Sequence, residues 1–177
     1  MTNANPFAQR SSLEFELPPF ADIRDEHYLP AFYAGCQAQL AEVAEILATP
    51  GSATFENTIV ALEKSGQMLM RTLLVFFNKS SSDTSDALDA IEEEMAPKLA
   101  AHQDAINLNP ALFTRIKSLY DNRESIGLNS EDAWLLERYY KDLIHAGAHL
   151  SDSERARLKY LFGLAAQRPS YKKPRLT

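Results

Sequence analysis

Two histidines four residues apart come nearest to a metal-binding pattern in this sequence. His145 and His149 have the spacing of H-E-x-x-H, in which two imidazoles on one helical face bind zinc and the glutamate acts as general base. Here Ala146 stands where the glutamate is needed, and Gly147 between the histidines is typical of a helix end. We therefore expect two solvent-facing histidines at the end of a helix and no metal site.

The other reactive side chains do not form a catalytic pattern either. Cys36 has no basic neighbour in the sequence that would favour its thiolate, so a buried, inert thiol is expected. The serines stand in caps and turns, and none lies in a G-x-S-x-G motif. Glu92, Glu93 and Glu94 point in different directions around a helix and should be solvated. The sequence therefore predicts no catalytic, cofactor-binding or metal-binding residue in this chain.

A histidine and three aromatic residues could have either a functional or a structural role. His102 stands on an apolar helical stripe, where a histidine is more often a core residue with its hydrogen bonds satisfied than a ligand. Trp134, Tyr139 and Tyr140 could line a groove, but aromatic residues at helical spacing usually belong to the core. We expect all four to have structural roles.

Composition favours a soluble, helical protein. The 177 residues are 45% apolar and 24% charged, with only six glycines. Residues 1–154 hold 11 basic and 24 acidic side chains, which argues against a nucleic-acid-binding domain. The first residues lack the apolar core of a signal peptide, and no apolar run has membrane-spanning length. We expect a cytoplasmic protein with no membrane or nucleic-acid partner.

One long amphipathic stretch organises the rest of the chain. From Thr54 to Lys79, apolar residues recur at steps of four and three, and only Gly66 interrupts the stripe. The pattern predicts one helix of about 26 residues, roughly 39 Å long. Gly66 lies inside it, where it either permits a close helix crossing or merely weakens the helix.

Similar patterns predict further helices on both sides of this stretch. One helix should begin near Asp25 and end at Pro50-Gly51, and another follows the turn 80–86. Pro97 should kink or split the latter. One further helix should begin at Asn109-Pro110, and the next should run from Ser130 to near Gly147. Ser151 and Glu154 form a capping box that predicts a final helix. Short connections favour antiparallel neighbours. The predicted fold is an all-α array of about six antiparallel helices.

The two ends of the chain are predicted to be irregular. Residues 1–24 read as an extended lead-in because Pro18 and Pro19 disfavour helix, with Phe15, Leu17 and Phe20 available to pin it to the core. Residues 25–162 form the helical domain. Residues 163–177 form an irregular basic tail, in which Pro169 and Pro174 forbid a continuous helix.

Several stretches together resemble one protein family. They are Glu16–Phe32, Thr54–Gly66, Phe76–Ile106, Asn109–Arg123 and Glu137–Leu161. In these stretches the chain resembles the N-terminal region of the thimet-oligopeptidase-like zinc metallopeptidases, and most of all the bacterial peptidyl-dipeptidases (dipeptidyl carboxypeptidases). None of the stretches is a catalytic signature, and the resemblance fades beyond about Leu161, where the chain turns to its basic tail.

The resemblance implies a function for a longer protein. Members of this family are all-helical and several times longer, and their H-E-x-x-H zinc motif lies in the C-terminal portion. For the peptidyl-dipeptidases, the resemblance implies zinc-dependent removal of C-terminal dipeptides from short peptides. That motif has no counterpart here, so the resemblance implies an inactive N-terminal channel-wall domain, truncated or frameshifted, whose partner is the missing catalytic part. The alternative is a free-standing helical interaction module, and either form is expected to be able to self-associate through uncovered apolar surface.

Overall fold

Helices make up nearly all the regular structure of this chain. The computed structural model describes residues 5–151, 153, 154, 157 and 160. Within them there is no strand, and the all-α prediction is confirmed. The α-helices are α1 (Tyr28–Ala48), α2 (Ala61–Lys64), α3 (Gln67–Ser82), α4 (Asp86–Asn107), α5 (Pro110–Asp121) and α6 (Ser130–Ala146). Short 3₁₀ turns occupy Glu14–Glu16 and Asp25–His27, and a π-helical turn, Glu56–Val60, leads into α2.

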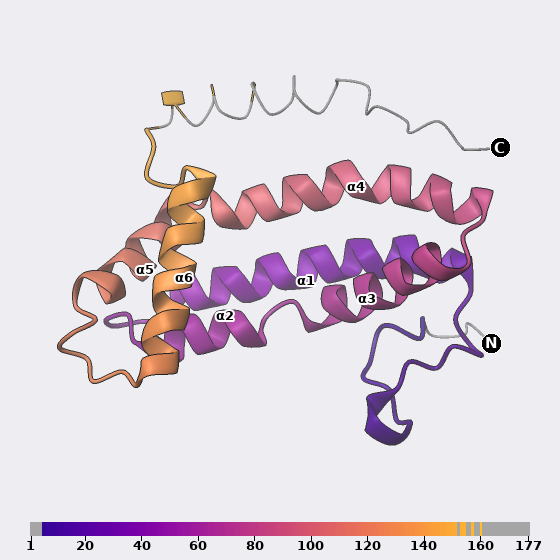
Figure 1. The fold of residues 1–177 in the computed structure, drawn as a ribbon, viewed down its shortest axis with the longest axis horizontal. Helices are drawn as coiled ribbons and strands as arrows, with labels where there is room; N and C mark the ends of the chain where they lie inside the picture. Colours follow the sequence, from indigo (N-terminus) through magenta and orange to yellow (C-terminus); the bar gives the residue numbers. More distant parts are fainter. Residues whose placement is uncertain (1–4, 152, 155–156, 158–159, 161–177) are drawn as a thin grey trace.

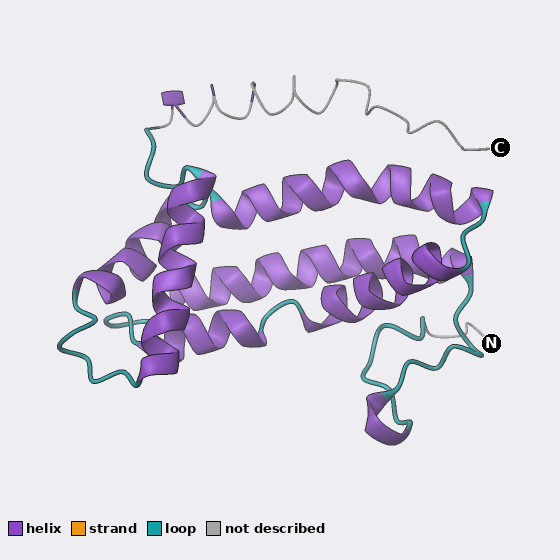
Figure 2. Ribbon diagram, viewed as in Figure 1, coloured by secondary structure: helices purple, strands orange, loops and turns teal. Residues whose placement is uncertain are grey.

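The molecule is elongated, with α6 lying across one end. α1 and α4 run along the long axis, and α2 and α3 follow one another along α1 in the opposite direction (Figures 1 and 2). α5 and α6 pack together at the end where α1 finishes and α2 begins. No helix in the described part of the chain is both long and apolar enough to cross a membrane.

The predicted single helix from Thr54 to Lys79 is wrong. The chain leaves helical geometry at Ser65 (φ −78°, ψ 161°) and enters the left-handed region at Gly66 (φ +70°) before α3 begins at Gln67. Glycine tolerates this conformation because it has no Cβ. The break preserves the phase of the apolar stripe, so Leu62 before it and Leu69 after it are both buried.

The close helix crossing lies at Gly35 of α1 rather than at Gly66. A Cβ added to Gly35 would lie 2.8 Å from the Cα of Leu69 in α3, a distance that no real side chain tolerates. α1 and α3 therefore pack backbone to backbone near this point. Gly66 instead faces the side chain of Gln39, whose Nε2 would lie 2.4 Å from an added Cβ.

The buried side chains divide into two clusters along the molecule. The first joins the lead-in to α1, α3 and α4, with Phe32 and Phe76 fully buried. The second joins the end of α1 to the π-helical turn, α2, α5 and α6, with Ile59, Ile116 and Leu136 fully buried. α1 contributes to both clusters and so holds the two halves of the molecule together.

Local signals predicted the starts of α5 and α6 and the end of α6, whereas α5 ends at Asp121, before the Gly127 that was expected to end it. Of the two outcomes predicted at Pro97, a kink or a split, the split is excluded because α4 is one helix through Pro97. Pro97 is exposed, where water can satisfy the carbonyl that proline leaves free. Asn109 caps α5 through hydrogen bonds from two backbone N–H groups, and Gly147 (φ +94°) ends α6. The Ser151–Glu154 capping box is also present. The helix it was predicted to open lies largely outside the described residues, as does the tail 163–177.

The lead-in is held to the core by residues other than those predicted. Phe15, Leu17 and Phe20 are exposed, Phe15 by 86%, whereas Phe7 and Ile23 are buried in the first cluster. The Phe7 ring lies against Tyr28, with their centroids 5.6 Å apart. The proline-rich segment between these two anchors therefore loops outward, and Phe15 adopts a positive φ of 56° within it.

Candidate functional site

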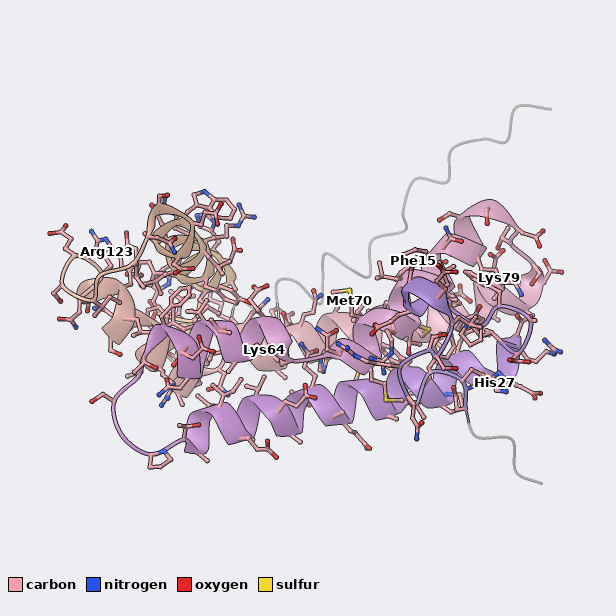
Figure 3. The ribbon with its side chains drawn as sticks, turned by 90° about the horizontal axis from the view of Figure 1, so that it is seen from below. Phe15, His27, Lys64, Met70, Lys79 and Arg123 are labelled. Carbon is pink, nitrogen blue, oxygen red and sulfur yellow. The ribbon has the colours of Figure 1, made fainter. Side chains whose placement is uncertain are left out.

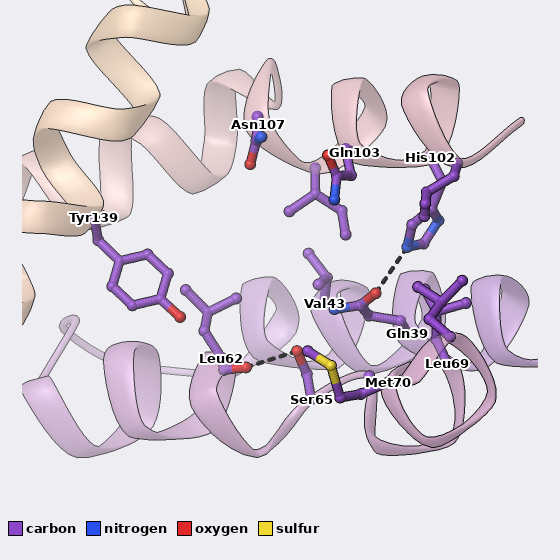
Figure 4. Close-up of a pocket in the computed structure, with 14 residues that line it drawn as sticks. Gln39, Val43, Leu62, Ser65, Leu69, Met70, His102, Gln103, Asn107 and Tyr139 are labelled. Atoms are coloured by element: carbon purple, nitrogen blue, oxygen red, sulfur yellow. Dashed lines mark hydrogen bonds between the residues drawn. The ribbon is translucent and has the colours of Figure 1, made fainter. Parts of the chain in front are cut away.

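A hollow of about 310 Å³ lies between the two clusters, where four helical segments meet. α1 contributes Gln39 and Val43, the α2–α3 break contributes Ser65 and Gly66, and α4 and α6 complete it (Figure 4). Its other polar residues are His102, Gln103, Asn107 and Tyr139. We refer to it below as the central hollow. Polar groups converge there beside apolar walls, as in ligand-binding pockets.

His102 of α4 and Gln39 of α1 form a hydrogen bond in the lining of the central hollow. His102 Nε2 lies 2.7 Å from Gln39 Oε1, and because the amide oxygen can only accept, the imidazole donates (Figure 4). Nδ1 is then an acceptor, and it is buried without a partner among the described residues. The prediction of a core histidine is confirmed, but only one of its two ring nitrogens is satisfied.

Burial keeps this imidazole neutral. Removal from water disfavours the imidazolium and lowers the pKa of His102. A neutral imidazole beside a carboxamide can donate and accept hydrogen bonds. No carboxylate contacts it in the described structure to make it a general base of the kind found in catalytic triads.

The break between α2 and α3 is tied to α1 by backbone and side-chain contacts. Gly66 N–H donates to Glu42 Oε2 at 2.6 Å, which satisfies one of the free N–H groups at the start of α3. Ser65 Oγ donates to the carbonyl oxygen of Leu62 at 2.7 Å. Glu42 of α1 thus holds the break in place, with Gln39 lying against Gly66, and nothing in the sequence pattern singled out either residue.

Replacing Gly66 by alanine should destabilise the protein more than the same change at Gly127. Both glycines have φ +70°, so each alanine would carry the same left-handed penalty of about 1–2 kcal/mol. Only at Gly66 would the new methyl group meet a neighbour, Gln39. Urea unfolding of the two variants measures the difference. Equal losses of unfolding free energy would mean that Gln39 moves aside freely.

The stability of the protein should fall below about pH 7 because of His102. Its pKa is lowered in the folded state, so the unfolded chain takes up the proton first as the pH drops through about 6.5. The free energy of unfolding therefore decreases in this range. Urea unfolding from pH 7.5 to 5 should show a shallower decrease for His102→Gln than for the parent. His145→Gln, which replaces an exposed histidine, is the control, and a slope unchanged by His102→Gln would contradict the prediction.

The two histidines with motif spacing do not share a helical face. His145 lies in the last turn of α6, and His149 lies beyond the left-handed Gly147 that ends the helix. Both side chains are exposed. Among the described residues no three histidine, cysteine or acidic side chains gather in a group that could hold a metal ion. The described residues therefore do not fit the zinc site of the metallopeptidases that the sequence resembles.

The remaining candidates have structural surroundings. Cys36 is half-buried, and burial raises the pKa of its thiol, which makes it less reactive. The Tyr140 ring stacks on Tyr120 with centroids 4.0 Å apart. Tyr139 lines the central hollow and donates to Glu63 Oε1 at 2.7 Å, and burial together with this contact raises its pKa. Trp134 is 65% exposed, so its assignment to the core is wrong.

One buried polar contact was not anticipated from the sequence. Arg115 of α5 donates to Thr58 Oγ1 at 2.9 Å and to Asn57 Oδ1 at 2.8 Å. Thr58 is fully buried in the π-helical turn. The arginine therefore fixes this turn against α5, which is a structural role. No sequence signal distinguished Arg115 from the solvated arginines.

Known proteins similar to this chain are peptidases. The dipeptidyl carboxypeptidase of Escherichia coli is 40% identical over 161 residues, which is 91% of this chain and 24% of that enzyme. The enzyme of the same name from Salmonella typhimurium is 37% identical over 90% of this chain. Oligopeptidase A of Escherichia coli is 24% identical over 81% of the chain. No protein-family model matches the sequence.

The chain spans about a quarter of the length of these curated relatives. The similarity covers nine tenths of the chain and nearly all the helices described above. The family resemblance predicted from the sequence is confirmed. This chain is homologous to part of the dipeptidyl carboxypeptidases, and more distantly to oligopeptidase A.

Proposed function

We propose that this chain is the N-terminal helical domain of a cytoplasmic, zinc-dependent peptidyl-dipeptidase and forms one wall of its substrate channel. The observation that carries the proposal is the 40% identity to a dipeptidyl carboxypeptidase over 91% of the chain but only 24% of the enzyme. A domain of this kind would occupy residues 25–162, with 1–24 as its lead-in and 163–177 as a tail. Its role would be to restrict access to short, unfolded peptides.

The chemistry would lie in the part of the enzyme that this chain does not span. The central hollow offers a neutral imidazole, amides and hydroxyls, which suit binding and packing rather than peptide hydrolysis. Zinc, when bound by that other part, would activate the water that attacks the peptide bond. The present chain would supply no metal ligand and no general base, and alone it should not cleave peptides.

A segment exchange tests the proposal. The matched 161-residue segment of the Escherichia coli enzyme is replaced by the matching part of this chain, and release of C-terminal dipeptides from an N-blocked oligopeptide is followed by mass spectrometry. The exchanged enzyme should release dipeptides, whereas the 177-residue chain with added zinc should release none. Dipeptide release by the chain alone, or a folded but inactive exchanged enzyme, would overturn the proposal.

The chain alone should self-associate weakly. Leu13, Leu17 and Phe20 of the lead-in are each at least half exposed, and Phe15 is more so. Apolar side chains that are normally covered promote association when the cover is absent. Light scattering from about 10 to 500 μM should show the mean mass rising with concentration. A strictly monomeric protein over this range would count against an uncovered apolar surface.

A further inference from the structure

The solvent-facing side of α3 carries no charged side chain. Its exposed residues, which we call the α3 outer face, are Gln67, Met70, Leu74, Phe77, Asn78, Ser81 and Ser82. Met70, Leu74 and Phe77 are 56%, 64% and 39% exposed, and their spacing of four and three aligns them in one stripe. Met70, which also lines the central hollow (Figure 4), points away from α1, on which α3 packs (Figure 3). An apolar stripe therefore runs along the outside of this helix.

The two charged residues of α3 both turn toward the lead-in. Lys79 Nζ lies 3.0 Å from Asp25 Oδ1, and the Arg71 guanidinium donates to the carbonyl oxygen of Phe7 at 3.3 Å. Both charged groups therefore contact the lead-in, and neither belongs to the α3 outer face. The opposite side of α3 is buried through Leu69, Val75 and Phe76. α3 thus has a buried apolar side and an uncharged outer side with an apolar stripe, a pattern that favours a helix covered on both sides.

Another long helix of the same molecule shows the usual pattern. The exposed side of α4 carries Asp86, Asp89, Glu93, Glu94 and Lys98, as expected of a helix that faces water. The difference between the two helices lies in their outward sides, since both bury an apolar stripe in the first cluster. The uncharged side of α3 is therefore a local property and does not reflect the composition of the whole chain.

We propose that the α3 outer face packs against the polypeptide that lies outside the matched segment in the longer relatives. The inference rests on the proposed function, because about three quarters of the relatives' length lies outside the match. The covering segment would present an uncharged, apolar surface to Met70, Leu74 and Phe77. Three partly exposed side chains offer far less than the roughly 800 Å² per partner of a stable intermolecular interface. Within one polypeptide, linkage supplies the effective concentration that so small a contact needs.

Thiol labelling measures directly whether the α3 outer face is covered. Leu74→Cys is made in the 177-residue chain and in the exchanged enzyme described above, and the rate of its reaction with a maleimide is followed on the corresponding peptide by mass spectrometry. The thiol should react at least about tenfold more slowly in the exchanged enzyme, because a covered site reacts only when it opens. Ala90→Cys, at an exposed position of α4, is the matched control and should react alike in both proteins.

The outcomes separate this inference from the proposed function. Equal rates for Leu74→Cys in an exchanged enzyme that releases dipeptides would overturn the inference and leave the proposed function standing. An exchanged enzyme that folds but releases no dipeptides would overturn the proposed function and with it the basis of the inference. If labelling of the lone chain slows steeply as its concentration rises, while the exchanged enzyme is labelled rapidly, a second copy covers the face and the inference is wrong.

Discussion

Replacing Phe76 by alanine should lower the free energy of unfolding by about 3–5 kcal/mol. The side chain is fully buried in the first cluster, and its ring meets Tyr28 edge to face with centroids 5.2 Å apart. Truncation removes that contact and leaves a cavity between α1, α3 and the lead-in, which the surrounding helices can fill only partly. Urea unfolding followed by circular dichroism measures the loss.

Phe77→Ala is the matched control for this prediction. It deletes the same atoms from the next residue of the same helix, but Phe77 is 39% exposed and belongs to the α3 outer face. Its truncation should cost clearly less in the chain alone. If the two variants lose the same unfolding free energy, the two sides of α3 do not differ in burial as described.

Gly35→Leu should destabilise the protein by about 3 kcal/mol and could prevent the native packing of α1 on α3. Helix propensity alone favours the change, because leucine is better than glycine in a helix interior by nearly 1 kcal/mol. The steric term outweighs this gain, since the first added atom would already lie 2.8 Å from the Leu69 Cα and backbone cannot move aside as a side chain can. Thermal unfolding shows directly whether Gly35→Leu lowers or raises the stability of the protein.

Ala34→Leu is the control, because it places a leucine in the same helix without the steric clash with α3. Residue 34 precedes Gly35 in α1 and is exposed, so the new side chain meets solvent. This variant should be close to the parent in stability. A Gly35→Leu protein as stable as the parent would show that α1 and α3 are not held at backbone contact.

The helix ends that depend on local chemistry could be predicted from the sequence. Asn109 and Pro110 start α5, and Gly147 ends α6, because capping needs only side chains close by in the chain. The stripe of α4, from Leu88 through Met95 to His102, is likewise buried as its period predicts. These features follow from short-range geometry alone.

The break at Ser65-Gly66 could not be found from periodicity. The chain resumes its helix with the apolar stripe still in phase, so the spacing of the apolar residues predicts one continuous helix. Lysine, serine and glycine in succession at residues 64–66 were a usable signal for a helix end. The contacts at the break, from Gln39 and Glu42, come from another helix and have no local signature.

The central hollow illustrates the same limit. His102 could be placed in the core from its position on a stripe, but its partner Gln39 stands 63 residues earlier in an unremarkable part of α1. Phe15, Leu17 and Phe20 could have pinned the lead-in to the core because they are apolar, yet Phe7 and Ile23 take that place. Which apolar residue of an irregular segment is buried depends on the path of the loop, and composition does not determine that path.

We propose that this chain supplies helical structure to a dipeptide-releasing enzyme whose chemistry lies elsewhere. Dipeptide release from an N-blocked oligopeptide in the presence of zinc tests it most directly, with the 177-residue chain and the segment-exchanged Escherichia coli enzyme assayed side by side. We expect release by the exchanged enzyme and none by the chain alone. Release by the chain alone, or a folded exchanged enzyme that releases nothing, would contradict it.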